Sequence, residues 1–190
     1  MRKPVDITRG YQLCYMLLGQ VIISLVLMLM QFFMVIGSFN KDGVRIFVGV
    51  ITTVVYFIYI AVRACNLTKS DKKSYTPLNA SVKWAVIWGL SLVIFNILLI
   101  TIYKLFGAHL NGASNSVVSI IISVLFYILQ SPFLAFTVKS LDGNIPILLM
   151  ALITFMPFIS TLVGYYFGIN EIAIVDKINS IVFENDHKSE

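Results

Sequence analysis

Long apolar runs without charged residues alternate with short polar segments along most of the chain. A bilayer core about 30 Å thick needs roughly 20 helical residues, so each run has about the length of a membrane-spanning helix. A transmembrane β-barrel would instead show alternating polar and apolar positions over ~10-residue stretches. The pattern predicts an all-α fold, an integral membrane helical bundle of about five transmembrane helices. The predicted spans are Tyr11–Ile36, Ile46–Val62, Trp84–Tyr103, Val117–Val138 and Ile145–Phe167.

The composition agrees with a membrane protein. Of the 190 residues, 58% are hydrophobic and 12% are charged, whereas soluble domains contain roughly a quarter charged residues. The mean hydropathy is +0.90. At this length we expect a single transmembrane domain over residues 1–167, followed by a polar tail over residues 168–190. Two cysteines, Cys14 and Cys65, are too few for a disulfide framework.

The basic residues predict how the helices are oriented. Three lie before residue 11 and five in the segment 63–83, but two lie in 37–45 and one in 104–116. Because cytoplasmic loops are enriched in Lys and Arg, this bias predicts a cytoplasmic N-terminus in the cell membrane. Five spans then place the C-terminus outside, with Tyr165 and Tyr166 at the outer end of the last span. The basic residues are scattered between apolar runs, so no nucleic acid is expected as a partner.

The tail has an amphipathic pattern of its own. At 100° per residue its apolar side chains fall within an arc of about 120°. These side chains are Ile174, Val175, Ile178, Ile181 and Val182. The pattern predicts either a short interfacial or partner-packing helix, or a last helical turn that frays.

Polar side chains inside the predicted spans gather on one face of each helix. Over the span 117–138 they fall within an arc of about 80°. The candidate residues on these faces are Gln20, Gln31, Tyr56, Asn96, Ser119, Ser123, Tyr127 and Gln130. Such faces are expected to point away from lipid, toward other helices or toward a cavity.

Two interpretations of these faces stand side by side. Small and amide side chains at helical spacing are ordinary contacts between membrane helices, with interhelical hydrogen bonds contributing roughly 0.6–2 kcal/mol each. Alternatively, they line a polar cavity for a small neutral or zwitterionic solute, with Gln130 and Asn96 as the best orienting groups. Pro132 and Pro157 are predicted to kink their helices, because each leaves a backbone carbonyl without its helical donor.

The predicted spans contain no Asp, Glu, Lys, Arg or His. Proton relays, cation sites and voltage sensors generally need such residues, so an ion-coupled pump is not expected. We interpret the acids Asp71 and Asp142 as isolated loop residues. The sequence also lacks GxSxG, HExxH and Walker motifs. We therefore expect no enzyme, no cofactor and no metal site.

The last span ends in the stretch GYYFGINEIAIVDKI, residues 164–178. This stretch resembles the closing pattern of a group of uncharacterised small multi-pass membrane proteins of Firmicutes. The matching residues, in the last quarter of the chain, are Pro157, Gly164, Tyr165, Gly168 and Lys177. The chain departs from that group in its central loop, NLTKSDKKSYTPLN, and in its ending, FENDHKSE. The resemblance implies a bacterial protein and implies no particular activity.

These patterns favour a non-enzymatic multi-pass protein that serves as an accessory subunit, packed against a membrane partner or against itself. One alternative is a small neutral-solute transport protein or a substrate-binding membrane subunit of an importer. Another is a sensor or immunity protein for membrane-active peptides. The lipid bilayer is a partner in every case.

Overall fold

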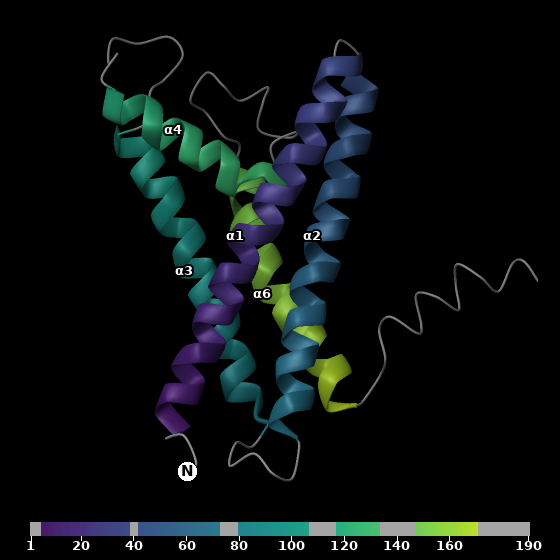
Figure 1. The fold of residues 1–190 in the computed structure, drawn as a ribbon, viewed down its shortest axis with the longest axis vertical. Helices are drawn as coiled ribbons and strands as arrows, with labels where there is room; N and C mark the ends of the chain where they lie inside the picture. Colours follow the sequence, from purple (N-terminus) through teal and green to yellow (C-terminus); the bar gives the residue numbers. More distant parts are fainter. Residues whose placement is uncertain (1–4, 39–41, 73–79, 107–116, 134–146, 171–190) are drawn as a thin grey trace, which may run out of the picture.

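The computed structural model describes residues 5–38, 42–72, 80–106, 117–133 and 147–170 of the chain (Figure 1). Its elements are α1 (Val5–Ser38), α2 (Asp42–Asp71), α3 (Val82–Phe106), α4 (Val117–Leu129), the 3-10 turn η1 (Ser131–Phe133) and α6 (Ile147–Ile169). Every regular element within these residues is helical, which confirms the predicted all-α bundle.

Four of these helices, α1, α2, α3 and α6, are long and apolar enough to cross a membrane. The chain is therefore a membrane protein. The helix α4 has 13 residues, or roughly 20 Å at 1.5 Å per residue, which is shorter than a bilayer core of about 30 Å. The described helices thus provide four crossings, where the sequence pattern predicted about five.

The helix α2 continues past Val62 to Asp71, well beyond the charge-free run that predicted it. Two expectations were therefore wrong. Asp71 is the last residue of a helix and is buried, so it is not a loop acid. The expectation of spans without charged residues was also wrong, because Arg63 lies inside the candidate span Ile46–Asp71. A helix satisfies its own backbone in lipid and in water alike, so it does not need to end where the apolar composition ends. The other predicted loop acid, Asp142, lies outside the described residues.

The described part of the chain begins and ends at the same end of the bundle (Figure 1). At that end Arg9 of α1 pairs with Asp71 of α2, and Lys72 donates a hydrogen bond to the carbonyl oxygen of Ile169 at 2.8 Å. The predicted placement of Tyr165 and Tyr166 on the side opposite to the N-terminus is therefore wrong. The error follows from counting α4 as a full crossing. The predicted amphipathic tail lies outside the described residues.

The helix α6 packs mainly against α2 and α3. Three small residues at successive turns of α6 face α2. Ser160 donates to the carbonyl oxygen of Phe57 at 2.8 Å, and a side chain at Gly164 would collide with the backbone of Ala61. A Cβ at Gly168 would lie 2.8 Å from the carbonyl oxygen of Cys65. Small residues at four-residue intervals let two helix backbones approach closely. In lipid, where the hydrophobic effect does not drive helices together, this close packing stabilises the pair.

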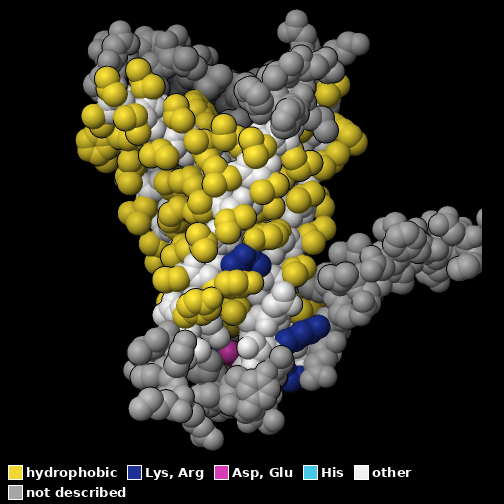
Figure 2. Space-filling model, viewed as in Figure 1, with side chains coloured by type: hydrophobic (Ala, Val, Ile, Leu, Met, Phe, Trp, Pro, Cys, Tyr) yellow, Lys and Arg dark blue, Asp and Glu magenta, His cyan; other side chains and the backbone are white. Residues whose placement is uncertain are grey.

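Side chains are distributed as a membrane requires. The face of the bundle seen in Figure 2 is apolar over most of its described height, and large exposed side chains include Leu29, Phe47 and Ile94. The interior holds amides and hydroxyls beside apolar groups such as Trp88 and Leu92. Polar groups avoid hydrocarbon and pair with one another inside, so the interior of this bundle is where its chemistry is concentrated.

Candidate functional site

A helix ends in the interior of the bundle, where α4 gives way to η1. The backbone N–H of Gln130 donates to Phe126 at 2.9 Å, and that of Phe133 donates to Gln130 at 3.0 Å. Pro132 has no N–H and cannot continue the α-helical ladder. The chain therefore tightens into a 3-10 turn, and Pro132, which was predicted to kink a longer helix, lies in this turn.

Side chains of α1 satisfy carbonyl groups that the helix end leaves free. Ser24 Oγ donates to the carbonyl oxygen of Leu129 at 2.9 Å, and Gln31 Nε2 donates to that of Ser131 at 2.7 Å. Ser131 Oγ in turn donates to the carbonyl oxygen of Ser24. An unsatisfied carbonyl in the membrane interior costs several kcal/mol, so this face of α1 holds the turn in place.

Side chains of α2 bind the same turn from the other side. Thr52 Oγ1 and Thr53 Oγ1 both donate to the carbonyl oxygen of Pro132, at 2.9 and 3.2 Å. Tyr56, one turn further along α2, meets Phe133 edge to face with ring centroids 5.5 Å apart. The polar faces of α1 and α2 thus converge on one short irregular segment.

Asn96, fully buried on α3, joins three other elements. Its Oδ1 accepts a hydrogen bond from Gln20 Nε2 of α1 at 2.6 Å and one from Gln130 Nε2 at 3.1 Å. Its Nδ2 donates to the carbonyl oxygen of Ile153 of α6 at 3.3 Å. Gln130 and Asn96, which the sequence suggested as orienting groups for a solute, are therefore hydrogen-bonded to each other.

The hydrogen bond from Asn96 to Ile153 compensates for a donor that a proline lacks. Pro157 lies inside α6 and lacks the N–H that would reach the carbonyl four residues earlier, which is that of Ile153. Asn96 supplies the missing donor. Thr161 Oγ1 also donates back to the carbonyl oxygen of Pro157, at 2.7 Å. The helix passes through the proline without ending.

The outer part of the α4 face packs differently. Ser123 Oγ donates to the carbonyl oxygen of Ser119 within the same helix, at 2.9 Å. Tyr127 and Tyr103 of α3 share a hydrogen bond between their hydroxyls, 3.1 Å apart. Phe126 stacks on Tyr103 with ring centroids 4.1 Å apart. This face therefore contacts α3 through aromatic rings.

Three buried polar atoms on uncharged side chains have no hydrogen-bond partner among the described residues. They are Gln20 Oε1, the Tyr56 hydroxyl and Trp88 Nε1. Buried polar groups are normally satisfied by protein or by ordered water. These atoms mark the places where the interior has spare hydrogen-bonding capacity.

A second polar cluster, which the sequence analysis missed, lies at the N-terminal end of the bundle. Arg9 pairs with Asp71, and Gln12 donates to Asp71 Oδ1 at 2.7 Å and accepts from Arg9 at 2.8 Å. The Arg9 guanidinium also lies 4.5 Å from the ring centroid of Trp84. The cluster links α1, α2 and α3. One signal could have found it: Ala64, Thr68 and Asp71 share one face of a continued helix.

Apart from the buried Arg9–Asp71 pair, the chemistry available in the interior is that of neutral amides and hydroxyls. Within the described residues, no three His, Cys, Asp or Glu side chains lie close enough to hold a metal ion. Comparisons with protein families, curated proteins and solved structures found no match to the chain.

Proposed function

We propose that this chain is a non-enzymatic membrane subunit that packs against a partner membrane protein or a second copy of itself. The observation that carries this proposal is the pairing of Gln130, Asn96 and Gln20 with one another. Side chains that bind a solute need free donors and acceptors directed into a cavity. Here the amides serve mainly to hold helices together, which fits a structural role.

The outward face of α4 is the best candidate for the contact with a partner. It carries apolar side chains that are half or more exposed: Val117, Val118, Ile120, Ile121 and Leu125. The helix is too short to cross a bilayer on its own. A second membrane helix packed along it would cover this face.

The orientation we propose puts the end with Arg9 in the cytoplasm. Near that end lie five basic residues of the described part of the chain, namely Arg9, Arg63, Lys69, Lys72 and Lys83, whereas Arg45 and Lys104 lie toward the other end. Cytoplasmic sides of membrane proteins carry the excess of Lys and Arg. The same reasoning places the protein in the cell membrane.

Site-specific crosslinking in native membranes tests the partner. A photo-reactive residue at Ile121 of α4 should trap a neighbouring protein, whereas one at Ile94 of α3, which is similarly exposed, should trap much less. Mass spectrometry of the adduct distinguishes a second copy from another protein. A purified monomer and the absence of any adduct from Ile121 would contradict the proposal.

Small-solute transport is a second candidate, supported by the unpartnered Gln20 Oε1, Tyr56 hydroxyl and Trp88 Nε1. A neutral solute or water could use this hydrogen-bonding capacity. A thermal-shift screen against vitamins, amino acids and nucleosides tests it. A stabilising ligand whose effect disappears in Gln20→Leu would favour transport. The absence of a thermal shift with every compound would favour the accessory role.

A further inference from the structure

Arg63 carries a positive charge within a helix that is long and apolar enough to cross the membrane. Its guanidinium is fixed against α1: Nη2 donates to the carbonyl oxygen of Tyr15 at 2.6 Å, and Nη1 donates to the hydroxyl of Tyr59 at 2.8 Å. The guanidinium carbon also lies 3.5 Å from the ring centroid of Tyr15. The side chain is half-buried, so part of it faces the surroundings of the bundle.

No carboxylate in the described part of the chain pairs with this charge, since Asp71 pairs with Arg9 instead. Charged groups in membrane spans are costly and normally have a counter-charge. A guanidinium has five N–H donors, and the hydrogen bonds to Tyr15 and Tyr59 use two of them. The Nε–H is buried, so the charge and the remaining N–H groups of the two terminal nitrogens are available for an anion.

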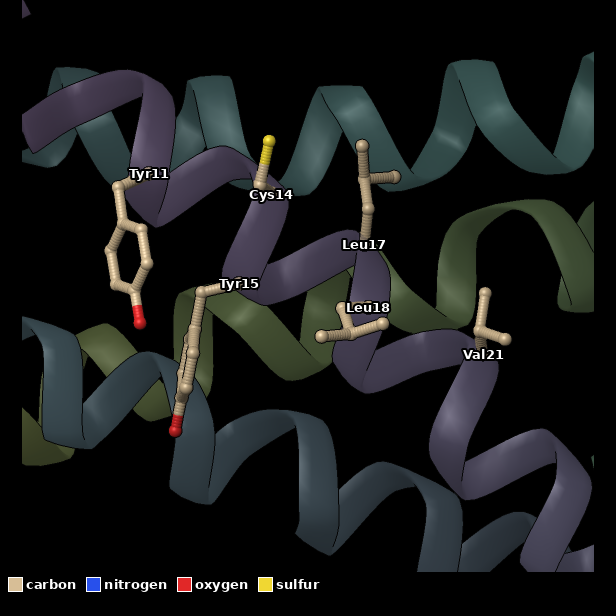
Figure 3. Close-up of a pocket in the computed structure, with 6 residues that line it drawn as sticks. All are labelled: Tyr11, Cys14, Tyr15, Leu17, Leu18 and Val21. Carbon is tan, nitrogen blue, oxygen red and sulfur yellow. The ribbon is translucent and has the colours of Figure 1, made fainter. Parts of the chain in front are cut away.

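A shallow apolar depression of about 420 Å³ runs along α1 beside this charge. It is lined by Tyr11, Cys14, Tyr15, Leu17, Leu18 and Val21 (Figure 3). Tyr15, which forms one edge of the depression, is the residue whose ring and carbonyl oxygen hold Arg63. A cationic group and the apolar depression thus lie next to each other on the outer surface of the bundle.

We propose that Arg63 and this depression bind one anionic phospholipid. The headgroup phosphate accepts hydrogen bonds from the exposed part of the guanidinium, and one acyl chain lies past Leu18 and Val21. Charge complementarity selects the occupant, because the anion must reach a cation at the lipid-facing surface. Lys69, Lys72 and Lys83 lie near the same end, and basic clusters at the cytoplasmic surface attract anionic lipids.

Gly19 positions the guanidinium. A Cβ at this residue would lie 2.6 Å from Cδ and 2.7 Å from Cζ of Arg63, so any larger residue would displace the side chain. Gly10, on the same helix, has nothing within 4 Å of its would-be Cβ. Gly19→Ala and Gly10→Ala are therefore a matched pair of variants, of which only the first disturbs the proposed site.

Native mass spectrometry of the full chain in detergent tests the proposal with palmitoyl-oleoyl phosphatidylglycerol and phosphatidylcholine as probes. We expect the anionic lipid to bind more tightly. Loss of one basic contact should weaken its binding about fivefold, so Arg63→Gln and Gly19→Ala should both show this loss. Lys104→Gln, which removes an exposed basic charge at the other end of the bundle, and Gly10→Ala should bind as the parent chain does.

A second variant leaves Arg63 unchanged, so the test does not depend on whether Arg63→Gln folds. Leu18 is 57% exposed, so Leu18→Trp should fold normally and fill the depression, weakening phosphatidylglycerol binding while leaving Arg63 in place. Unchanged affinity in Leu18→Trp, or equal affinity for the two lipids, would overturn the proposal. Binding of inorganic phosphate as tight as that of phosphatidylglycerol would overturn it too. So would a crosslink to a protein, in place of lipid, from a photo-reactive residue at position 18.

Discussion

The side-chain amide of Asn96 donates to the carbonyl oxygen of Ile153, the carbonyl that Pro157 leaves without its helical donor. A defect in α6 is thus repaired by a residue of α3 that lies 57 positions away in sequence. The other end of the same side chain accepts from Gln20 and Gln130. One buried asparagine therefore couples a proline in α6 to the end of α4.

Asn96→Ala should destabilise the bundle by about 1–3 kcal/mol, because interhelical hydrogen bonds contribute roughly 0.6–2 kcal/mol each and their partners would be left unsatisfied. In a Pro157→Ala background residue 157 regains its N–H and can satisfy Ile153 itself. The cost of Asn96→Ala should then fall by about 0.5–1 kcal/mol. Unfolding followed by circular dichroism in mixed detergent micelles measures both values.

Asn66→Ala is the control for this cycle. Asn66 is exposed on α2, and its replacement should change the free energy of unfolding by less than about 0.5 kcal/mol. An equal cost for Asn96→Ala in the two backgrounds would show that Asn96 does not compensate for the proline.

Arg9→Gln or Asp71→Asn alone should cost about 3 kcal/mol, because each leaves a charge buried without its partner. The two side chains are 6% and 1% exposed, so water cannot replace the lost contact. The double variant should cost clearly less than the sum, since it removes both charges. Denaturation curves of the three variants test this, with Lys104→Gln, an exposed charge on α3, as a control that should stay near the parent. Additive costs would refute the pairing.

Gly164→Ala and Gly10→Ala should have opposite effects. A Cβ at residue 164 would lie 2.8 Å from the Ala61 Cα, and backbone cannot move aside as a side chain can. The helices α2 and α6 must separate, at a cost of about 1–3 kcal/mol. At residue 10 the methyl group meets open space, and alanine should gain up to about 1 kcal/mol from helix propensity. Thermal unfolding in detergent measures the pair, and equal signs would contradict the close packing of α2 on α6.

Cysteine labelling with a membrane-impermeant maleimide tests the shared end of the bundle. In a chain without Cys14 and Cys65, Ser81→Cys and Asn170→Cys should react from one side of the membrane and Phe106→Cys from the other. In intact cells the first two should be protected and the third labelled, because we propose that the end with Ser81 is cytoplasmic. Labelling of residues 81 and 170 from opposite sides would contradict four crossings.

The polar faces could be predicted from the sequence because helical periodicity depends on local spacing alone. Gln20, Asn96 and Gln130 were recognised in this way as candidate site residues. Their pairing could not be predicted, because it depends on which turns of three helices meet at the same depth. The Arg9–Asp71 pair was missed for a related reason: the charge-free run ended at Val62, so Asp71 was assigned to a loop.

The sequence by itself determined the class of the molecule. Charge-free runs of sufficient length force the backbone into helices that satisfy their own hydrogen bonds in lipid, and this requires no knowledge of which helix lies beside which. Pro132 limits how far α4 can extend, but tertiary structure decided that the chain turns inside the bundle, since the donors that stabilise the free carbonyls come from Ser24 and Gln31 of α1 and from α2. It also decided that α6 returns to the N-terminal end. Both features depend on contacts between residues far apart in the chain, which local patterns do not encode.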